Sequence, residues 1–393
     1  MKKIIVLLRR DAEDFKGEMI AAHNRTKELI KNFPDAEIKI FVLREYFNHF
    51  FCKVRGVSYI QKKSHFDYDG IKYNALWFKF SACDNILCKF KKHPFFLYKR
   101  LNRFVDYLKG ADLIISHSTT AGYVAMKAKE KYGIPYTITW HGSDIHTTPF
   151  SNPFTKALTV SLIENASANC FVSKDLLNKS EMLTKNSKKF VLYNGVDRTR
   201  FKPYDSIQKN NAKTKYGIAS NAKHVAYIGN LYHIKNVLAL PEIYKMVTEK
   251  LSSFSVVFHF IGDGALRDEL DNRCKSSGIN YLLWGNQPPE FLPEIINCMD
   301  LVVLPSLNEG LPLVSVETLA CGVPMVGANV GGISEAIGNE NVIDHGESFT
   351  EKMSDLIASR LSHPTQVHLV DDFSWQKTGK IEKEIISSLI CNK

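Results

Sequence analysis

Two carboxylates flank a polar turn between an apolar strand and a helix. The strand expected at 301–305 is followed by Glu309 and Gly310, and the helix expected at 311–320 carries Glu317 on its second turn. The first N–H groups of a helix lack acceptors within it, and the helix dipole is positive there, so a diphosphate suits that end. The rise of about 1.5 Å per residue separates the two carboxylates by roughly 8 to 10 Å, too far to share a proton. This layout favours a nucleotide sugar, with sugar hydroxyls, diphosphate and ribose hydroxyls in sequence; the alternative is two structural or solvated carboxylates.

Further motifs occur in a fixed order along the chain. They are Trp140-His141-Gly142-Ser143-Asp144, Ser173, Asn194-Gly195-Val196-Asp197, Ala320-Cys321-Gly322-Val323-Pro324, Val330-Gly331-Gly332-Ile333 and Phe373-Ser374-Trp375. Together with the spacing of Glu309 and Glu317, this set resembles the family 4 retaining glycosyltransferases, which have the GT-B fold. The resemblance covers nearly the whole chain except about 46–109. It implies an α/β fold of two Rossmann-like, doubly wound parallel-sheet domains with an interdomain cleft.

The resemblance also implies roles for single residues. The residue matching Glu309 binds hydroxyls of the donor sugar, and the one matching Glu317 binds the ribose. His141 lies near the reacting anomeric carbon, where its carbonyl or imidazole stabilises developing positive charge; the alternative is a histidine in a strand-end turn capped by Asp144. The diphosphate and sugar are approached by the segment Gly310, Leu311, Pro312 and Leu313.

The expected phosphate contacts depart from the family pattern at one position. The family usually has an arginine five residues before a lysine, both on the diphosphate; Lys235 matches the lysine, but Asn230 replaces the arginine. A neutral amide cannot supply a bidentate guanidinium contact, so stabilisation of the leaving group rests more on Lys235 and the helix end. Glycine turns at Gly17, Gly262 and Gly285 are further candidate donor contacts.

Short apolar runs alternate with helical patterns, which predicts buried parallel strands covered on both faces. In the first half we expect strands at 3–8, 37–43, 112–116 and 136–140 and a helix at 119–132 that ends at Gly133. The pattern restarts with a strand at 224–229. We expect an acceptor-binding domain at 1–198 and a nucleotide-sugar-binding domain at 199–371. As the resemblance implies, segment 372–393 returns to pack on the first domain.

Composition excludes several classes of protein. The chain has 393 residues, 45% of them hydrophobic, so it is neither disordered nor too short for a core. No apolar run reaches the ~18 to 20 residues of a spanning helix, and the apolar run after Met1-Lys2-Lys3 is too short for a signal peptide. The eight cysteines form no Cys-x-x-Cys pair. They are expected to be reduced and buried, in a cytoplasmic protein.

Charge divides unevenly along the chain. Residues 1–195 carry a balance of +14 and residues 196–393 a balance of −4. The basic half predicts an anionic partner. Cations and aromatics interleave from Lys89 to Lys109, which is typical of a segment lying on an anionic membrane surface. The alternative is an ordinary solvated helix with a core stripe; nucleic acid is disfavoured because no nucleic-acid module accompanies the segment.

Two patterns imitate metal sites. Asp67-Tyr68-Asp69 has the Asp-x-Asp form of metal-dependent glycosyltransferases, but the following Gly70 indicates a hairpin turn. His141 and His146 are five residues apart, which does not place both on one helical face. We therefore expect no metal and no cofactor.

The sequence predicts a metal-independent retaining glycosyltransferase of hexosyltransferase type. It would move a sugar from a UDP- or GDP-sugar to a glycan or a polyprenyl-diphosphate-linked acceptor, in bacterial surface polysaccharide synthesis. It would be cytoplasmic, peripheral on the inner face of the membrane. The alternatives are a non-catalytic nucleotide-sugar-binding partner, favoured by Asn230, and a sugar-nucleotide epimerase of the same fold.

Overall fold

The structure is a computed structural model that describes residues 1–9, 17–46, 61–79, 81–90, 94–365, 367 and 369–390. The chain divides into two compact units, Met1–Tyr193 with Trp375–Lys393, and Asn194–Ser374. The boundaries expected after 198 and 371 thus fall after Tyr193 and Ser374. The shift arises because Val196 and Ser374 form a β-bridge within the second unit.

The first unit contains an eight-stranded sheet in the order β3-β4-β2-β1-β5-β6-β7-β8. All neighbouring strands run parallel except the β3–β4 pair at one edge. The strands are β1 (Lys3–Leu8), β2 (Glu37–Tyr46), β3 (His65–Tyr68), β4 (Ile71–Lys79), β5 (Leu113–His117), β6 (Tyr136–Trp140), β7 (Ala168–Phe171) and β8 (Lys189–Val191). The strands expected at 3–8 and 136–140 are confirmed residue for residue.

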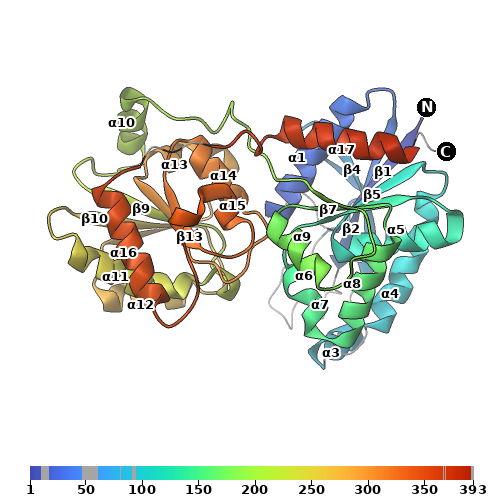
Figure 1. Cartoon of the computed structure of the whole chain (residues 1–393), viewed down its shortest axis with the longest axis horizontal. Coiled ribbons are helices and arrows are strands. Elements are labelled where there is room, and N and C mark those ends of the chain that lie inside the picture. Colours follow the sequence, from blue (N-terminus) through green and yellow to red (C-terminus); the bar gives the residue numbers. More distant parts are fainter. Residues whose placement is uncertain are drawn as a thin grey trace. The chain divides into compact units, whose positions relative to one another are not determined.

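Helices connect these strands, as the labels in Figure 1 show. They are α1 (Gly17–Asn32), α3 (Ala82–Lys89), α4 (Phe95–Leu101), η2 (Asn102–Leu108), α5 (Ser118–Tyr132), α6 (Ser143–His146), α7 (Thr148–Ser151), α8 (Pro153–Asn165), α9 (Lys174–Glu181) and α17 (Trp375–Ile390). Helix α5 ends where the sequence predicts, because Gly133 adopts a left-handed φ of 67° that closes its last turn.

The unassigned stretch 46–109 supplies the sheet edge and a helical segment. Strands β3 and β4 form a hairpin whose two turn residues, Asp69 and Gly70, have φ of 47° and 74°. This confirms the hairpin predicted from Asp67-Tyr68-Asp69-Gly70, since positive φ at both central residues defines a tight hairpin turn. The Asp69 carboxylate accepts hydrogen bonds from Lys27 (2.7 Å) and lies 3.1 Å from His23 Nε2.

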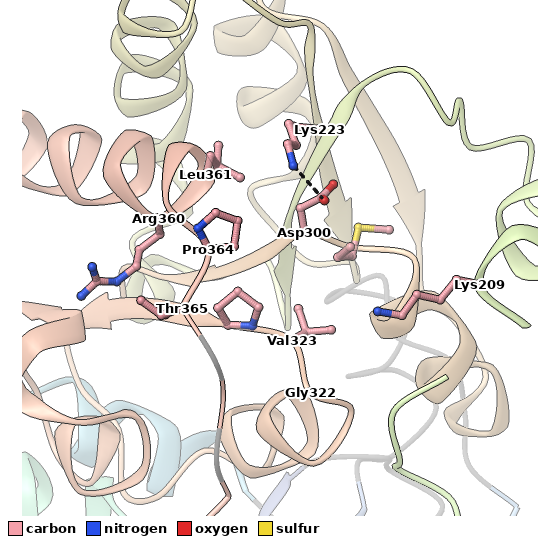
Figure 2. Close-up of a pocket in the computed structure, with 11 residues that line it drawn as sticks. Lys209, Lys223, Asp300, Gly322, Val323, Arg360, Leu361, Pro364 and Thr365 are labelled. Carbon is pink, nitrogen blue, oxygen red and sulfur yellow. Dashed lines mark ion pairs between the residues drawn. The ribbon is translucent and has the colours of Figure 1, made fainter. Parts of the chain in front are cut away.

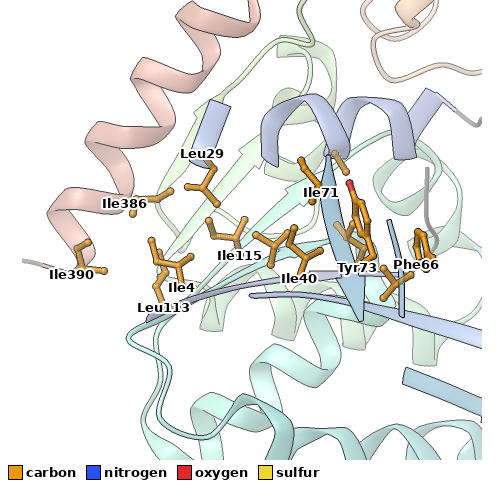
Figure 3. Packing of buried hydrophobic residues seen from close by; sticks show 14 residues of the cluster. Ile4, Leu29, Ile40, Phe66, Ile71, Tyr73, Leu113, Ile115, Ile386 and Ile390 are labelled. Atoms are coloured by element: carbon orange, nitrogen blue, oxygen red, sulfur yellow. The ribbon is translucent and has the colours of Figure 1, made fainter. Parts of the chain in front are cut away.

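The last helix, α17, completes the first unit. It packs beside α1 (Figure 1), where Arg25 Nη2 donates to Glu382 Oε1 at 2.7 Å in a buried ion pair. Ile386 and Ile390 enter the apolar cluster around Ile4 and Leu113 on the sheet (Figure 3). The chain therefore crosses from the first unit to the second and returns to finish the first core.

The second unit contains a six-stranded parallel sheet in the order β11-β10-β9-β12-β13-β14. Its strands are β9 (Lys223–Ile228), β10 (Val256–Ile261), β11 (Tyr281–Gly285), β12 (Leu301–Leu304), β13 (Met325–Ala328) and β14 (Val342–Ile343). The helices are α10 (Ser206–Lys215), η3 (His233–Lys235), η4 (Val237–Ala239), α11 (Leu240–Lys250), α12 (Arg267–Ser277), η5 (Pro289–Phe291), α13 (Leu292–Asn297), α14 (Leu313–Ala320), α15 (Ile333–Ile337), η6 (Asn339–Asn341) and α16 (Phe349–Ser362).

A buried hydrogen-bond chain crosses three strands of this sheet. Trp284 Nε1 donates to His259 Nδ1 at 3.0 Å, and His259 Nε2 lies 3.0 Å from His224 Nδ1. His224 Nε2 donates to the Ala219 carbonyl at 2.6 Å. Because an indole N–H only donates and a carbonyl only accepts, every proton in the chain is assigned and both imidazoles are neutral.

We expect the hydrogen-bonded histidines, His259 and His224, to make the second unit less stable in acid. Burial lowers the pKa of His259 to about 3 and also lowers the pKa of His224. Between pH 6 and 4 His259 is protonated in the unfolded chain but not in the folded one, so stability falls by about 1.4 kcal/mol per unit decrease in pH for this residue. The lowered pKa of His224 acts in the same direction. Thermal unfolding of wild type and His259→Phe across this range measures it; equal slopes for both proteins would refute this origin.

Candidate functional site

The sequence-predicted donor residues of the second unit gather at the carboxyl ends of its strands. Lys235 and Asn230 follow β9, Gly262 follows β10, Gly285 ends β11 and Glu309 follows β12. In an open parallel sheet this edge is where ligands bind, because loops and helix N-termini meet there. One edge of one sheet therefore holds all of these side chains and turns.

Glu309 and Lys235 form an ion pair at this edge. Lys235 Nζ lies 2.6 Å from Glu309 Oε1, and Ser306 Oγ donates to the same oxygen at 2.7 Å. The Glu309 side chain is 8% exposed and that of Lys235 is 23% exposed. The carboxylate is thus fixed in place by two donors, and both charges remain within reach of a ligand. Ser306 was missed in the sequence, although it lies three residues before Glu309.

Two other segments donate hydrogen bonds to main-chain carbonyls of the loop from Gly310 to Leu313. The Gly332 N–H donates to the Gly310 carbonyl at 2.5 Å, and Asn194 Nδ2 donates to the Leu311 carbonyl at 2.9 Å. Gly331 has a φ of 58°, and a Cβ there would lie 2.1 Å from the Glu309 carbonyl oxygen. Only glycine fits so close to the Glu309 carbonyl, so Gly331 of the Val330–Ile333 motif allows the loop to pack closely against it.

Helix α14 begins at the end of this loop, with Pro312 at its N-cap position. Proline donates no hydrogen bond, and the first N–H groups of the helix have no acceptors within it. The start of α14 therefore presents donors and a positive dipole end beside the Lys235 ammonium. That combination suits a diphosphate.

Glu317 lies one and a half turns into α14 and is half-buried. Removal of its carboxyl from water raises its pKa to about 7, while the Arg200 charge acts in the opposite direction. A carboxyl with a raised pKa can donate a hydrogen bond when it is protonated and accept when it is ionised, and both suit contact with ligand hydroxyls.

The predicted glycine turns pack against one another. Gly262 has a φ of 132°, and a Cβ there would lie 2.0 Å from the Gly229 carbonyl oxygen. The Gly262 N–H donates to the Gly285 carbonyl at 2.8 Å. Asn230, next to Gly229, is exposed, and its carbonyl accepts a hydrogen bond from Tyr227 Oη at 2.8 Å. These glycines bring the loops after β9, β10 and β11 close together.

His141 lies in the first unit, directly after β6. Its N–H and that of Gly142 both donate to the Asp144 carboxylate, the Gly142 bond at 2.8 Å. Burial, with the nearby Glu18 charge, raises the pKa of Asp144 to about 7. Burial, with the Arg25 charge, lowers the pKa of His141 to about 3, so its imidazole is neutral. The turn capped by Asp144 is present, and the imidazole is further bonded to His117, which sequence reasoning missed.

Gly17 is the first residue of α1. A Cβ at this position would have nothing within 4 Å, so no close approach within the described residues requires glycine there. The turn before it, residues 10–16, lies outside the described residues.

Two family models match the chain. One is described as Glycosyltransferase Family 4 and matches residues 64–200; the other is described as Glycosyl transferases group 1 and matches residues 208–368. Together they span more than half of the sequence. The chain belongs to the family 4 glycosyltransferases.

Individual relatives agree with this family 4 assignment. The N-acetyl-alpha-D-glucosaminyl L-malate synthase of Bacillus anthracis is 32% identical over 230 residues, 57% of this chain and 56% of that protein. The UDP-Gal:alpha-D-GlcNAc-diphosphoundecaprenol alpha-1,3-galactosyltransferase of Escherichia coli is 27% identical over 344 residues, 80% of this chain and 84% of that protein. The chain thus spans little more than half the length of some curated relatives that it matches.

A solved structure agrees with the fold of this family 4 chain. The crystal structure of Anabaena Alr3699/HepE in complex with UDP-glucose matches with a TM-score of 0.67 at 17% identity, covering 100% of this chain and 99% of that one. The GT-B fold predicted from the sequence is confirmed.

The opposite edge of the second sheet carries a different cavity. At the amino ends of β9, β12 and β13, a pocket of about 190 Å³ is lined by Lys223, Asp300, Lys209 and their neighbours (Figure 2). Lys223 Nζ and Asp300 Oδ1 are 3.6 Å apart in it. None of the sequence-predicted donor residues of this family 4 chain lines this pocket.

The described residues also show whether side chains are grouped for a metal ion and whether a helix could cross a membrane. Among the described side chains of this family 4 chain, no group of three His, Cys, Asp or Glu residues is placed to hold a metal ion. His146 instead lies 3.1 Å from Asp175 and 2.7 Å from Lys179 Nζ. No helix in the described ranges is both long enough and apolar enough to cross a membrane.

Proposed function

We propose that this chain is a retaining glycosyltransferase that uses a nucleoside diphosphate sugar, UDP- or GDP-linked, as donor. The observation that carries the proposal is the Lys235–Glu309 ion pair beside the start of α14. It joins a cation and helix N–H groups for a diphosphate to a fixed carboxylate for sugar hydroxyls. The solved HepE structure, described as a complex with UDP-glucose, supports a donor of this class.

Each residue has a role in the proposed transfer. The Lys235 ammonium has three donors, so it can bond a diphosphate oxygen while still bonded to Glu309. Glu309 accepts bonds from sugar hydroxyls and Glu317 from the ribose. As the bond from the anomeric carbon to the diphosphate breaks, Lys235 and the N–H groups near Leu311 stabilise the leaving charge.

The acceptor side completes the proposed reaction. The acceptor hydroxyl attacks the anomeric carbon on the face that the diphosphate leaves, and its proton passes to the departing diphosphate oxygen. The neutral His141 stabilises the oxocarbenium-like sugar. The positive charge needed at the diphosphate comes from Lys235 and the helix end, so the proposal includes no metal ion. The protein's contribution is positioning and electrostatic stabilisation.

We further propose a glycan or polyprenyl-diphosphate-linked acceptor, in bacterial surface polysaccharide synthesis. The balance of +14 over residues 1–195 favours an anionic acceptor. The Escherichia coli relative is named for a diphosphoundecaprenol-linked acceptor, which is of this chemical class.

Membrane contact is part of this proposal, and the stretch from Lys89 to Lys109 divides in two. Its second half has the core stripe of an ordinary helical segment, because Leu101, Phe104 and Leu108 are buried. Arg100 there pairs with the buried Asp84. These residues stabilise the first unit and are not free for lipid.

The first half of the stretch exposes aromatic rings. Phe90, Phe95 and Phe96 are 72%, 56% and 48% exposed, and the last turn of α4 carries the Lys99 cation. We propose that this surface rests on anionic lipid at the cytoplasmic face of the membrane. Co-sedimentation with phosphatidylserine vesicles should fall in a Phe95→Ser/Phe96→Ser variant; unchanged binding would refute the placement.

One assay tests the proposed function against its rivals. Purified protein is incubated with UDP- and GDP-sugars, and products are separated by chromatography. A transferase hydrolyses its donor slowly without acceptor and keeps the anomeric configuration on transfer. Binding without turnover would indicate a non-catalytic partner, and a stereoisomeric nucleotide sugar would indicate an epimerase. Either outcome contradicts the proposal.

The Asn230→Arg variant is expected to bind the nucleoside diphosphate about 10-fold more tightly. An arginine there restores the second cation of the family pattern, and a hydrogen bond to a charged group is worth about 1.5 to 3 kcal/mol. Calorimetric titration measures the change, with Asn230→Gln as the uncharged control. Equal affinities of the two variants would show that position 230 does not face the diphosphate.

A further inference from the structure

His117, the last residue of β5, has a side chain that local structure does not require. It occupies the N-cap position of α5 but makes no side-chain cap bond. Ser, Thr, Asp or Asn at an N-cap stabilises a helix by about 1 kcal/mol, so histidine is not explained by capping. The residue is 1% exposed, which is rare for a polar ring without a hydrogen-bonding purpose.

The residue that follows His117 adopts an unfavourable backbone conformation. Ser118 has a φ of 67°, in the left-handed region that non-glycine residues seldom adopt. This conformation lets α5 start directly after β5, without an intervening loop. Strain of this kind persists only where surrounding contacts enforce it, and it concentrates at functional positions.

The ring of His117 contacts the ring of His141. His117 Nδ1 lies 3.0 Å from His141 Nε2, and the ring centroids are 5.3 Å apart at an interplanar angle of 23°. The contact arises because β5 and β6 are adjacent parallel strands, with His117 paired to Thr139. Both rings therefore extend from the carboxyl edge of neighbouring strands.

His141 is consequently held at two points. The Asp144 carboxylate fixes its main-chain N–H, and His117 fixes one ring nitrogen. Burial lowers the pKa of both histidines, so one proton is shared in the bond between two neutral rings. The two facing nitrogens share one proton, so the tautomer of each ring is coupled to that of the other, and the bond also restrains the orientation of the His141 ring.

We propose that His117 is a positioning residue for the glycosyl transfer, which holds the His141 imidazole in a single tautomer and orientation. This inference rests on the proposed function, in which His141 stabilises the positive charge that develops on the donor sugar. His117 itself touches neither substrate nor reacting atoms in this role. Loss of the partner that orients a metal-binding histidine commonly lowers activity by about 10- to 100-fold, and we expect a loss of this size here.

A double-mutant cycle tests the inference. Four proteins are compared with wild type for kcat and donor KM: His117→Ala, His117→Asn, His141→Ala and the double alanine variant. We expect His117→Ala to lower kcat about 10- to 100-fold with donor KM within about twofold. His117→Asn should recover most of the loss, because its amide nitrogen lies near the position of Nδ1. In the His141→Ala background, His117→Ala should have no further effect.

The outcomes distinguish failure of the role proposed for His117 from failure of the proposed function. Loss of activity in His141→Ala with wild-type kcat in His117→Ala would overturn the role of His117 and leave the proposed function intact. A full effect of His117→Ala in the His141→Ala background would also overturn it, since the role would then be structural. Wild-type activity in His141→Ala would refute His141 as a charge-stabilising group, and the inference would fall with it.

A spectroscopic measurement keeps the inference testable if His117→Ala does not fold. Imidazole ¹⁵N shifts report the tautomer of each histidine directly. We expect one tautomer for His141 in wild type and in His117→Asn, and a mixture in His117→Gln, whose longer side chain misplaces the amide. A mixture in the wild-type protein would overturn the proposal.

Discussion

The Glu309→Ala variant is expected to lose sugar transfer by at least about 10² to 10³-fold while largely retaining nucleoside diphosphate binding. The carboxylate is held by Lys235 and Ser306 at a fixed position beside the start of α14, and its proposed contacts are with sugar hydroxyls. Removal of one preorganised polar contact that strengthens in the transition state commonly costs this much in rate. The measurement is kcat from nucleoside diphosphate release, with calorimetric titration for binding.

Two further variants sharpen this prediction. Glu309→Gln keeps the shape but not the charge, so it should fall between wild type and alanine. Glu269→Gln alters an exposed carboxylate of the same unit that pairs with Arg273, and should behave as wild type. Equal transfer rates in wild type and Glu309→Ala would remove the sugar-binding role, and with it the main support for the proposed function.

Much of the fold follows from local patterns. Strand β1 contains a short continuous apolar run, Ile4–Leu8, which is typical of strands buried on both faces of a parallel sheet. Strand β6 is equally buried, although Thr137 and Thr139 alternate with its apolar residues. Gly133 and Gly70 mark a helix end and a hairpin turn because both need a left-handed backbone. Each of these features depends on a few neighbouring residues, so a single sequence contains the information.

Such local patterns did not predict the elements of segment 46–109. Strand β4 pairs in parallel with β2 and antiparallel with β3, at the edge of the sheet. Its burial is neither continuous nor strictly alternating, since it lies between two partners of different kind, contacts α4, and places Phe78 against Phe104 of η2. The helical part mixes buried and exposed aromatics, and therefore matches neither a simple core helix nor a simple surface helix.

The site was predicted as a set of parts, and the contacts between its parts were not. Lys235 and Glu309 were assigned separately to a diphosphate and a sugar. Their ion pair forms because β12 lies beside β9, although β10 and β11 come between them in the sequence. His117 was missed because its bond to His141 depends on the register of β5 on β6, in which His117 pairs with Thr139. Strand order is a global property that residue spacing does not encode.

Lys235 is expected to matter more in this chain than a single lysine would in a site with two cations. Asn230 supplies no charge, so in the proposed site the ammonium and the N–H groups of α14 are the groups that bind the diphosphate. Lys235→Ala should weaken nucleoside diphosphate binding by at least about 30-fold, because it truncates one member of a largely buried charge pair. It also leaves the Glu309 carboxylate, 8% exposed, without its counter-charge and closer to an anionic ligand.

Calorimetric titration of UDP and GDP measures this loss, and two controls show whether it is specific. Lys245→Ala removes an exposed lysine of α11 in the same unit and should leave affinity unchanged. Lys235→Arg keeps the charge and should recover part of the binding, but not all, because a planar guanidinium does not reproduce the geometry of an ammonium bonded to Glu309. The double variant Asn230→Arg/Lys235→Ala should bind better than Lys235→Ala alone, since the second cation then replaces the first. If Lys235→Ala bound both nucleotides as tightly as wild type, the diphosphate would have to lie elsewhere than beside the start of α14.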